Sequence, residues 1–185
     1  MIFDEVLILH SPKTATEIWL KSIVIAHNFC PFAKQTVTRN SIRFSTVDDT
    51  ATDICLQLLI DECERLDTDE TIETSLLIYS TAFADFEDYL DFLAYAEALL
   101  TQQGYDGIYQ LASFHPNYCF DGAELDDPAN YTNRSPYPML HLLRESSIER
   151  ALINVADPES IPQQNVVLTR KMGLAKMRDL LVACY

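Results

Sequence analysis

Basic residues are scarce in this chain, and their scarcity excludes the first class of partners. Lys and Arg number 13 against 28 Asp and Glu, which gives a formal net charge of −15. Binding to nucleic-acid phosphates or to anionic membranes requires a basic surface. We therefore expect neither nucleic acid nor membrane as a partner, and solubility accounts for the acidity.

Long apolar runs, glycine-rich phosphate loops and paired cysteines are missing as well. No run approaches the roughly 20 residues of a membrane span, and the start, MIFDEVLILHSPK, carries acids where a signal peptide has basic residues. Neither GxGxxG nor GxxxxGK[ST] occurs, which excludes a standard nucleotide loop and leaves any cofactor unknown. The chain has five cysteines, an odd number, and none of them forms a CxxC pair. They lie at positions 30, 55, 63, 119 and 184. These features predict a cytoplasmic protein with reduced thiols.

At 185 residues, the length predicts one domain over 1–185, in which residues 1–13 form an N-terminal strand or an arm. Hydrophobic patterns predict strands at 42–47, 74–80 and 108–114. They predict helices at 14–28 and 85–103, and another that begins at 48–50 and ends near 66. Two further helices are predicted, one from Pro138 towards Arg150 and one after Pro162 with a break or end at Gly173. This alternation indicates an α/β or α+β fold with a small mixed sheet of three to four strands packed by helices.

The segment from Phe114 to Glu145 is the richest in polar groups. It holds two of the four histidines, Arg134 and Arg144, and prolines at 116, 128, 136 and 138. Prolines fix local backbone geometry, and a stiff loop of hydrogen-bonding side chains is typical of a functional site. Alternatively, the segment only braces the fold.

Three blocks carry a resemblance to a known family: FCPFAK (29–34), YQLASFHPNY (109–118) and NYTNRSPYPMLHLLRE (130–145). In this order they resemble an uncharacterised bacterial family described as a domain of unknown function, over about 19–173. The resemblance implies a shared single domain, but it implies no activity, cofactor or catalytic residue.

Cys30 is the candidate nucleophile. If Pro31 opens a helix, Cys30 caps its N-terminus, where backbone N–H groups favour a thiolate, and Lys34 one turn later adds positive charge. The alternative is a buried cysteine packed between two phenylalanines.

His115 directly follows the predicted strand 108–114. We expect that strand to be internal to the sheet and to deliver His115 to a cleft at its carboxyl end, where the histidine acts as a general acid or base. The alternative is a histidine hydrogen-bonded to its own loop.

Arg134 lies among Asn130, Asn133 and Ser135, before the helix predicted at Pro138. A guanidinium beside helix N–H groups is a natural receptor for carboxylate or phosphate. The alternative is that Arg134 pairs with Asp126 or Asp127 and holds the loop together.

His141, Arg144 and Glu145 share one face if they lie on a helix. We expect His141 to assist proton transfer and Arg144 to bind the anion. A metal held by His141, Glu145 and His115 is a weaker alternative, and we predict no metal site.

The hypothesis for function is a small cytoplasmic enzyme, a hydrolase or group transferase, that acts on an anionic small molecule. His115, His141 and Cys30 are its candidate catalytic residues. The candidate substrate-binding residues are Arg134, Arg144, Asn130, Asn133, Ser135 and Lys34. The alternative is a non-catalytic module that binds a metabolite or a protein. The oligomeric state cannot be predicted.

Overall fold

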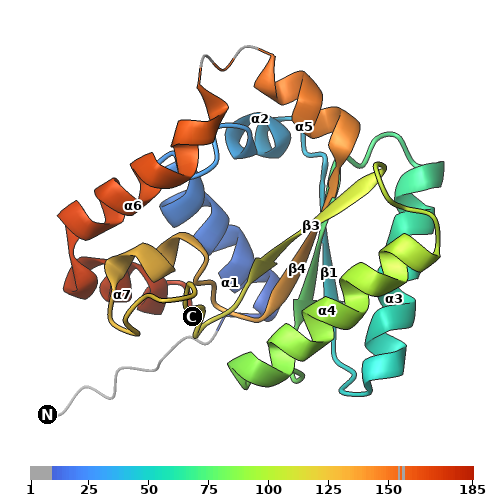
Figure 1. Ribbon diagram of the computed structural model, residues 1–185, viewed down its shortest axis with the longest axis horizontal. Coiled ribbons are helices and arrows are strands. Elements are labelled where there is room, and N and C mark those ends of the chain that lie inside the picture. Colours follow the sequence, from blue (N-terminus) through green and yellow to red (C-terminus); the bar gives the residue numbers. More distant parts are fainter. Residues whose placement is uncertain (1–9, 154, 156) are drawn as a thin grey trace, which may run out of the picture.

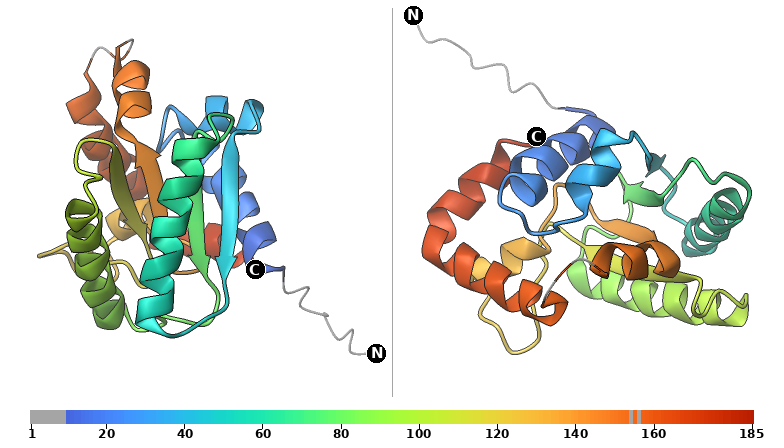
Figure 2. Two further views of the ribbon diagram at one scale, coloured as in Figure 1. Left: turned by 90° about the vertical axis from the view of Figure 1, so that its right-hand side faces the viewer. Right: turned by 90° about the horizontal axis from the view of Figure 1, so that it is seen from above.

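The computed structural model describes residues 10–153, 155 and 157–185. In this part of the chain a four-stranded mixed sheet lies between two groups of helices (Figures 1 and 2). The strands are β1 (Ile42–Val47), β2 (Thr74–Tyr79), β3 (Tyr109–Phe114) and β4 (Met139–Arg144). The α-helices are α1 (Pro12–Trp19), α2 (Ala33–Thr38), α3 (Thr52–Thr68), α4 (Phe86–Gln102), α5 (Glu145–Leu152), α6 (Ile161–Met172) and α7 (Leu174–Val182). Shorter segments are the π-helix η1 (Leu20–Ile25) and the 3-10 helices η2 (Pro128–Thr132) and η3 (Pro158–Ser160). The predicted single α/β domain is confirmed.

The strand order is β1-β2-β4-β3. β1 and β2 are parallel, whereas β4 is antiparallel to both of its neighbours. The prediction that the strand ending at Phe114 is internal is wrong, because β3 forms an edge. β4 lies inside the sheet between β2 and β3 instead, and its side chains Leu140 and Met139, which point to opposite faces, are both fully buried.

The helix predicted from Pro138 towards Arg150 is also wrong over its first half. Residues 139–144, MLHLLR, form β4 and pair with β2 and β3 on its two sides, and the helix α5 begins only at Glu145. Periodicity cannot distinguish a short apolar run in a buried strand from one in a helix. Residues 139–144 form a strand because their backbone groups pair with β2 on one side and with β3 on the other.

The remaining predicted elements are present with small shifts. The helix predicted at 14–28 is α1 followed by η1 and ends at Ile25. Asp85 caps α4 through bonds from two backbone N–H groups, and Gly173, with φ of 84°, separates α6 from α7. The strand or arm predicted at 1–13 lies mostly outside the described residues, and Pro12 already belongs to α1.

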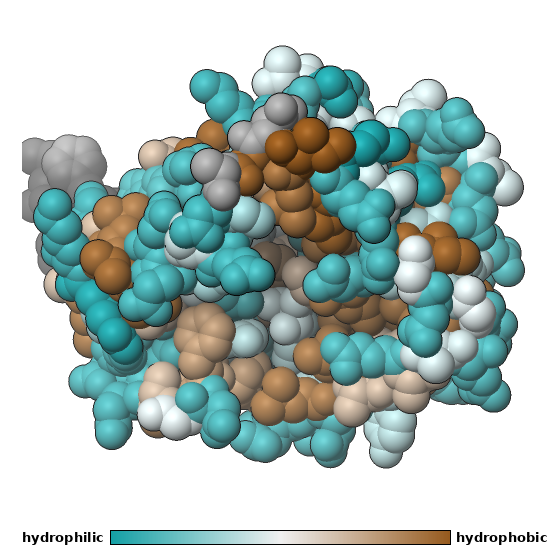
Figure 3. Space-filling model, turned by 45° about the horizontal axis from the view of Figure 1, so that its top comes forward, coloured by the Kyte–Doolittle hydropathy of each residue, from teal (hydrophilic) through white to brown (hydrophobic). Residues whose placement is uncertain are grey.

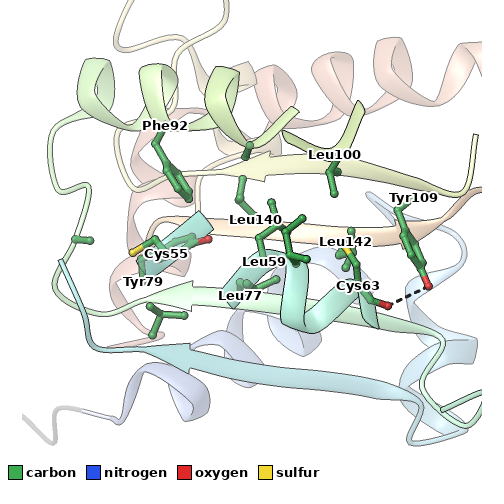
Figure 4. Close-up of a cluster of buried hydrophobic side chains, with 14 of the residues drawn as sticks. Cys55, Leu59, Cys63, Leu77, Tyr79, Phe92, Leu100, Tyr109, Leu140 and Leu142 are labelled. Carbon is green, nitrogen blue, oxygen red and sulfur yellow. Dashed lines mark hydrogen bonds between the residues drawn. The ribbon is translucent and has the colours of Figure 1, made fainter. Parts of the chain in front are cut away.

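Two hydrophobic clusters lie on the two faces of the sheet. α3 and α4 cover one face, where Cys55, Cys63, Tyr79 and Leu140 are buried (Figure 4). α1, η1, α6 and α7 lie on the other face, where Trp19 packs with Met139 and Met177. All five cysteines are in the described part of the chain and are free thiols. None of the helices described is long and apolar enough to cross a membrane.

Candidate functional site

His115 is fully buried, and the backbone binds both nitrogens of its ring. Nε2 donates to the carbonyl of Phe83 at 2.9 Å, and Nδ1 accepts the N–H of Asn117 at 3.0 Å. The rings of Phe86 and Tyr89 lie 5.1 Å from the imidazole. Burial lowers the pKa of His115, so the neutral ring joins the loop after β3 to the loop before α4.

Asn130 is fully buried in the loop between β3 and β4. Its Oδ1 accepts the N–H of Phe120 at 3.0 Å, and its Nδ2 donates to the carbonyl of Glu124 at 2.9 Å. Ser135 is also fully buried, and its hydroxyl donates to the carbonyl of Tyr137 at 2.6 Å. Both side chains supply hydrogen bonds that the backbone of an irregular loop lacks.

Arg134 also binds this loop. Its Nε donates to the carbonyl of Tyr118 at 3.0 Å and its Nη2 to that of Leu125 at 2.9 Å, while the guanidinium lies 4.7 Å from the ring centre of Tyr131. A strand rather than a helix follows Arg134, so the helix N-terminus expected next to it does not form. The geometry therefore supports a role in holding the loop together.

One of the two carboxylates expected to pair with Arg134, that of Asp127, has another partner. Asp127 accepts from Arg170 of α6 at 2.7 Å and 3.1 Å, and this pair lowers the pKa of the carboxyl group. Arg134 therefore holds the loop through carbonyl groups, while the Asp127 to Arg170 ion pair joins the loop to α6.

Arg144 lies at the opposite end of the sheet from Arg134. It stands opposite Tyr109 at the start of β3, whereas the loop that holds Arg134 follows the end of β3. Its guanidinium donates to the carbonyl of Leu66 and, at 3.1 Å, to that of Ile72, beyond the end of α3. A cation at a helix C-terminus is favoured by the helix dipole. The structure therefore does not bring the two arginines together.

His141 lies in β4, on the face opposite to that of Arg144, because side chains alternate along a strand. The hydroxyl of Thr74 donates to the carbonyl of Leu142 at 2.6 Å, so its oxygen accepts from Nε2 of His141 at 2.7 Å. Burial lowers the pKa of His141 to about 4. The one-helix arrangement expected for His141, Arg144 and Glu145 does not form, because only Glu145 is helical. Among the described residues no group of three or more His, Cys, Asp or Glu side chains could hold a metal.

A pocket of about 510 Å³ lies between η1, the end of β3, η2 and α6. Cys30 and Asn133 are the predicted site residues that line it. The other described lining residues are Val24, Phe29, Phe114, Phe120, Thr132, Ile161, Pro162, Gln163, Asn165 and Val166. Figure 3 shows that the face drawn is hollowed near its middle, with hydrophobic and pale side chains at the bottom and both hydrophilic and hydrophobic ones around the edge. All three sequence blocks reach this pocket, through Phe29 and Cys30, through Phe114, and through Thr132 and Asn133.

Cys30 enters the pocket from a turn and not from a helix cap. α2 begins at Ala33 with Phe32 at the capping position, so the predicted capping position of Cys30 is wrong. The carbonyl of Cys30 accepts the N–H of Ala33 at 3.2 Å. Lys34 is exposed on α2 and is not among the residues that line the pocket.

Sequence reasoning missed the α6 wall of the pocket. Asn165 donates from Nδ2 to the carbonyl of Phe29 at 2.8 Å, which ties α6 to the turn before Cys30. Phe114 and Phe120 were visible as apolar residues within the polar segment. The 136 residues that separate Phe29 from Asn165 left no sequence signal for their contact.

A second pocket of about 390 Å³ lies beyond the carboxyl ends of β1 and β2. Its lining residues include two acidic residues, Asp88 and Asp91, and three threonines, Thr50, Thr52 and Thr81. None of its described lining residues is a Lys or an Arg, so it does not suit an anion.

The fold and the pocket together define a class: a single-domain α/β protein with a mixed sheet and a mainly apolar pocket at one end of it. Within that class, the chain belongs to the family described as Protein of unknown function (DUF1415), which matches residues 11–179. This confirms the resemblance drawn from the three blocks. No curated protein and no solved structure matches the chain.

Proposed function

We propose that the protein binds a small, uncharged metabolite in the pocket between β3, η2 and α6. The observation that carries this proposal is the composition of a pocket of about 510 Å³. Its walls are mostly apolar with a few amide and hydroxyl groups, and no Asp, Glu, Lys, Arg or His is among the described residues that line it. Ligand pockets typically combine such a volume with a few fixed polar groups.

The second candidate is the enzyme expected from the sequence, a hydrolase or group transferase for an anionic small molecule. The observation in its favour is the thiol of Cys30 in the pocket wall. Against it, His115 and His141 do not line the pocket, and Arg134 and Arg144 donate to backbone carbonyls. Non-catalytic binding, the alternative reading of the sequence, therefore fits the geometry better.

Two substitutions on adjacent residues of α6 test the binding proposal. Val166 lines the pocket, whereas Val167 is 58% exposed. Val166→Phe should fill the pocket, and Val167→Phe is its matched control. Uncharged fragments detected by ligand-observed NMR should lose binding in Val166→Phe and keep it in Val167→Phe. If fragments bind both variants equally, or bind none of the proteins, the proposal is wrong.

The enzymatic candidate has a separate test. Turnover of p-nitrophenyl acetate that disappears in Cys30→Ser, with retained folding, would favour it. Equal rates in the two proteins would remove Cys30 from consideration as a nucleophile.

A cytoplasmic location is part of the same proposal. The five free thiols support it, because reducing compartments keep cysteines unpaired.

A further inference from the structure

The pocket of about 390 Å³ lies where the loops after β1 and β2 meet α4. β1 and β2 are the parallel pair of the sheet, and the pocket lies beyond the carboxyl ends of both strands. Open α/β sheets usually bind their ligands in the crevice beyond the carboxyl ends of the strands. This pocket is separate from the one between β3, η2 and α6, because the two share none of their described lining residues.

Two stacked aromatic rings contribute to the lining of this pocket. The ring of Phe83 stacks on that of Phe92 with ring centres 4.1 Å apart. Phe83 has a φ of 58°, which bulky residues rarely adopt, and its carbonyl accepts from the buried His115 at 2.9 Å. Strained backbone of this kind is concentrated at functional sites. The buried histidine, which the proposed function leaves unused, thereby helps to hold the aromatic lining in place.

One face of α4 supplies the rest of the helical lining. Asp88, Asp91, Phe92 and Tyr95 are spaced i, i+3, i+4 and i+7, so they lie on the same side of the helix. The ring of Tyr95 is 61% exposed. Asp88 and Asp91 are exposed too, and neither takes part in an ion pair within the described part of the chain. Both carboxylates are therefore available to a ligand.

The charge around this pocket has one sign. Its described lining residues include two acids and no Lys or Arg. Residues 66–133, which contain β2, the loop after it and α4, carry no Lys or Arg at all, and neither do residues 44–64, which contain the loop after β1 and most of α3. The chain as a whole has a net charge of −15. A cleft lined by charge of one sign concentrates ligands of the opposite sign, so the field favours a cation.

We infer that this second pocket binds an organic amine, whose ammonium group meets the carboxylates of Asp88 and Asp91. The apolar body of the amine packs against the rings of Phe83, Phe92 and Tyr95. Aromatic faces also attract cations, so the acidic and the aromatic lining favour the same ligand. Carboxylates and phosphates are repelled by the two aspartates. The inference does not depend on the uncharged ligand proposed for the other pocket.

Benzylamine, benzyl alcohol and benzoate form a series that tests the inference by NMR titration at neutral pH and low salt. The ammonium form of benzylamine should bind about tenfold more tightly than benzyl alcohol, since exposed ion pairs and cation–π contacts each contribute modestly. Benzoate should bind most weakly of the three. Asp91→Asn should lower the preference for benzylamine over benzyl alcohol by about threefold.

Glu97→Gln is the matched control, because it removes one charge from another side of the same helix, outside the described lining. This variant should keep the preference almost unchanged. If Asp91→Asn does not fold, Asp88→Asn must lower the preference instead. Val166→Phe, which fills the other pocket, should leave benzylamine binding as it is.

Several results would overturn the inference. Benzyl alcohol that binds as tightly as benzylamine, or a preference that survives both Asp91→Asn and Asp88→Asn, removes the role of the aspartates. An equal loss in Glu97→Gln means that the whole acidic surface attracts the amine and that no local site exists. Loss of benzylamine binding in Val166→Phe places the amine in the other pocket. In each of these cases the proposed function keeps its own separate test.

Discussion

Replacing Tyr79 with phenylalanine should leave the fold as stable as before or slightly more stable, whereas the same replacement at Tyr89 should destabilise it. Both side chains are fully buried on the same face of the sheet. Among the described residues, the hydroxyl of Tyr79 is the buried side-chain group that lacks a hydrogen-bond partner (Figure 4). The hydroxyl of Tyr89 donates to the carbonyl of Met139 at 2.7 Å. The pair therefore isolates the energy of one hydrogen bond.

The expected changes in the free energy of unfolding depend on whether each tyrosine hydroxyl has a hydrogen-bond partner. Burial of a hydroxyl without a partner costs the native protein about 1–3 kcal/mol, and the variant loses about 1 kcal/mol of packing contacts made by the oxygen. Tyr79→Phe should therefore change the free energy of unfolding by between zero and about 2 kcal/mol in the stabilising direction. Tyr89→Phe should lower it by about 1–2 kcal/mol, because the hydrogen bond disappears.

Urea unfolding followed by circular dichroism measures both changes. A difference of about 2 kcal/mol between the variants corresponds to midpoints roughly 1 M apart, for a slope of about 2 kcal/mol per M. The edge-on contacts of the Tyr79 ring with Phe83 and Phe92, at 5.1 and 5.2 Å, should persist in the variant because the ring remains. The reasoning is refuted if Tyr79→Phe destabilises the protein as much as Tyr89→Phe.

Three further predictions concern polar residues of the fold. Arg144→Met should lower the free energy of unfolding by about 2–4 kcal/mol, because charged donors to the carbonyl of Leu66 near the end of α3 and to that of Ile72 beyond it are lost. The exposed Arg39→Met should change it by less than about 0.5 kcal/mol. Equal urea midpoints for these two variants would contradict the assignment of Arg144. His141 has a folded-state pKa of about 4 against 6.5 unfolded, so the unfolded state binds more protons between these values and stability falls as pH is lowered through that window. His141→Gln should flatten this part of the curve of urea midpoint against pH, and a curve of unchanged slope would show that His141 does not titrate in this way. Asn130→Ala should destabilise by about 2–3 kcal/mol and speed amide hydrogen exchange in 115–134, because buried backbone groups lose their partners. Unaltered exchange in that loop would contradict its role.

Much of the secondary structure could be predicted because its signals are local. The strand Ile42–Val47 matches its predicted bounds, and Asp85 caps α4 because a short carboxylate can accept the first free N–H groups of a helix. Gly173 breaks the last helical segment because it adopts a positive φ, which is strained for residues with a Cβ. The prolines of the polar segment predicted a stiff loop, and internal hydrogen bonds from Asn130 and Arg134 hold that loop in the structure, whereas its role as a functional site stays a prediction.

The tertiary structure decided the rest. Residues 139–144 are a strand because β2 and β3 both offer unpaired backbone groups beside them, which no local pattern reveals. Because β4 lies between β2 and β3, β3 is at the edge of the sheet. His141 and Arg144 then lie on opposite faces of β4, and Arg134 and Arg144 lie at opposite ends of the sheet. The wall of the pocket opposite Phe114 is decided in the same way, since Asn165 meets Phe29 only when α6 packs beside η2. Residue types along the chain determined which groups could bind a ligand, but contacts between distant segments determined which of them face one.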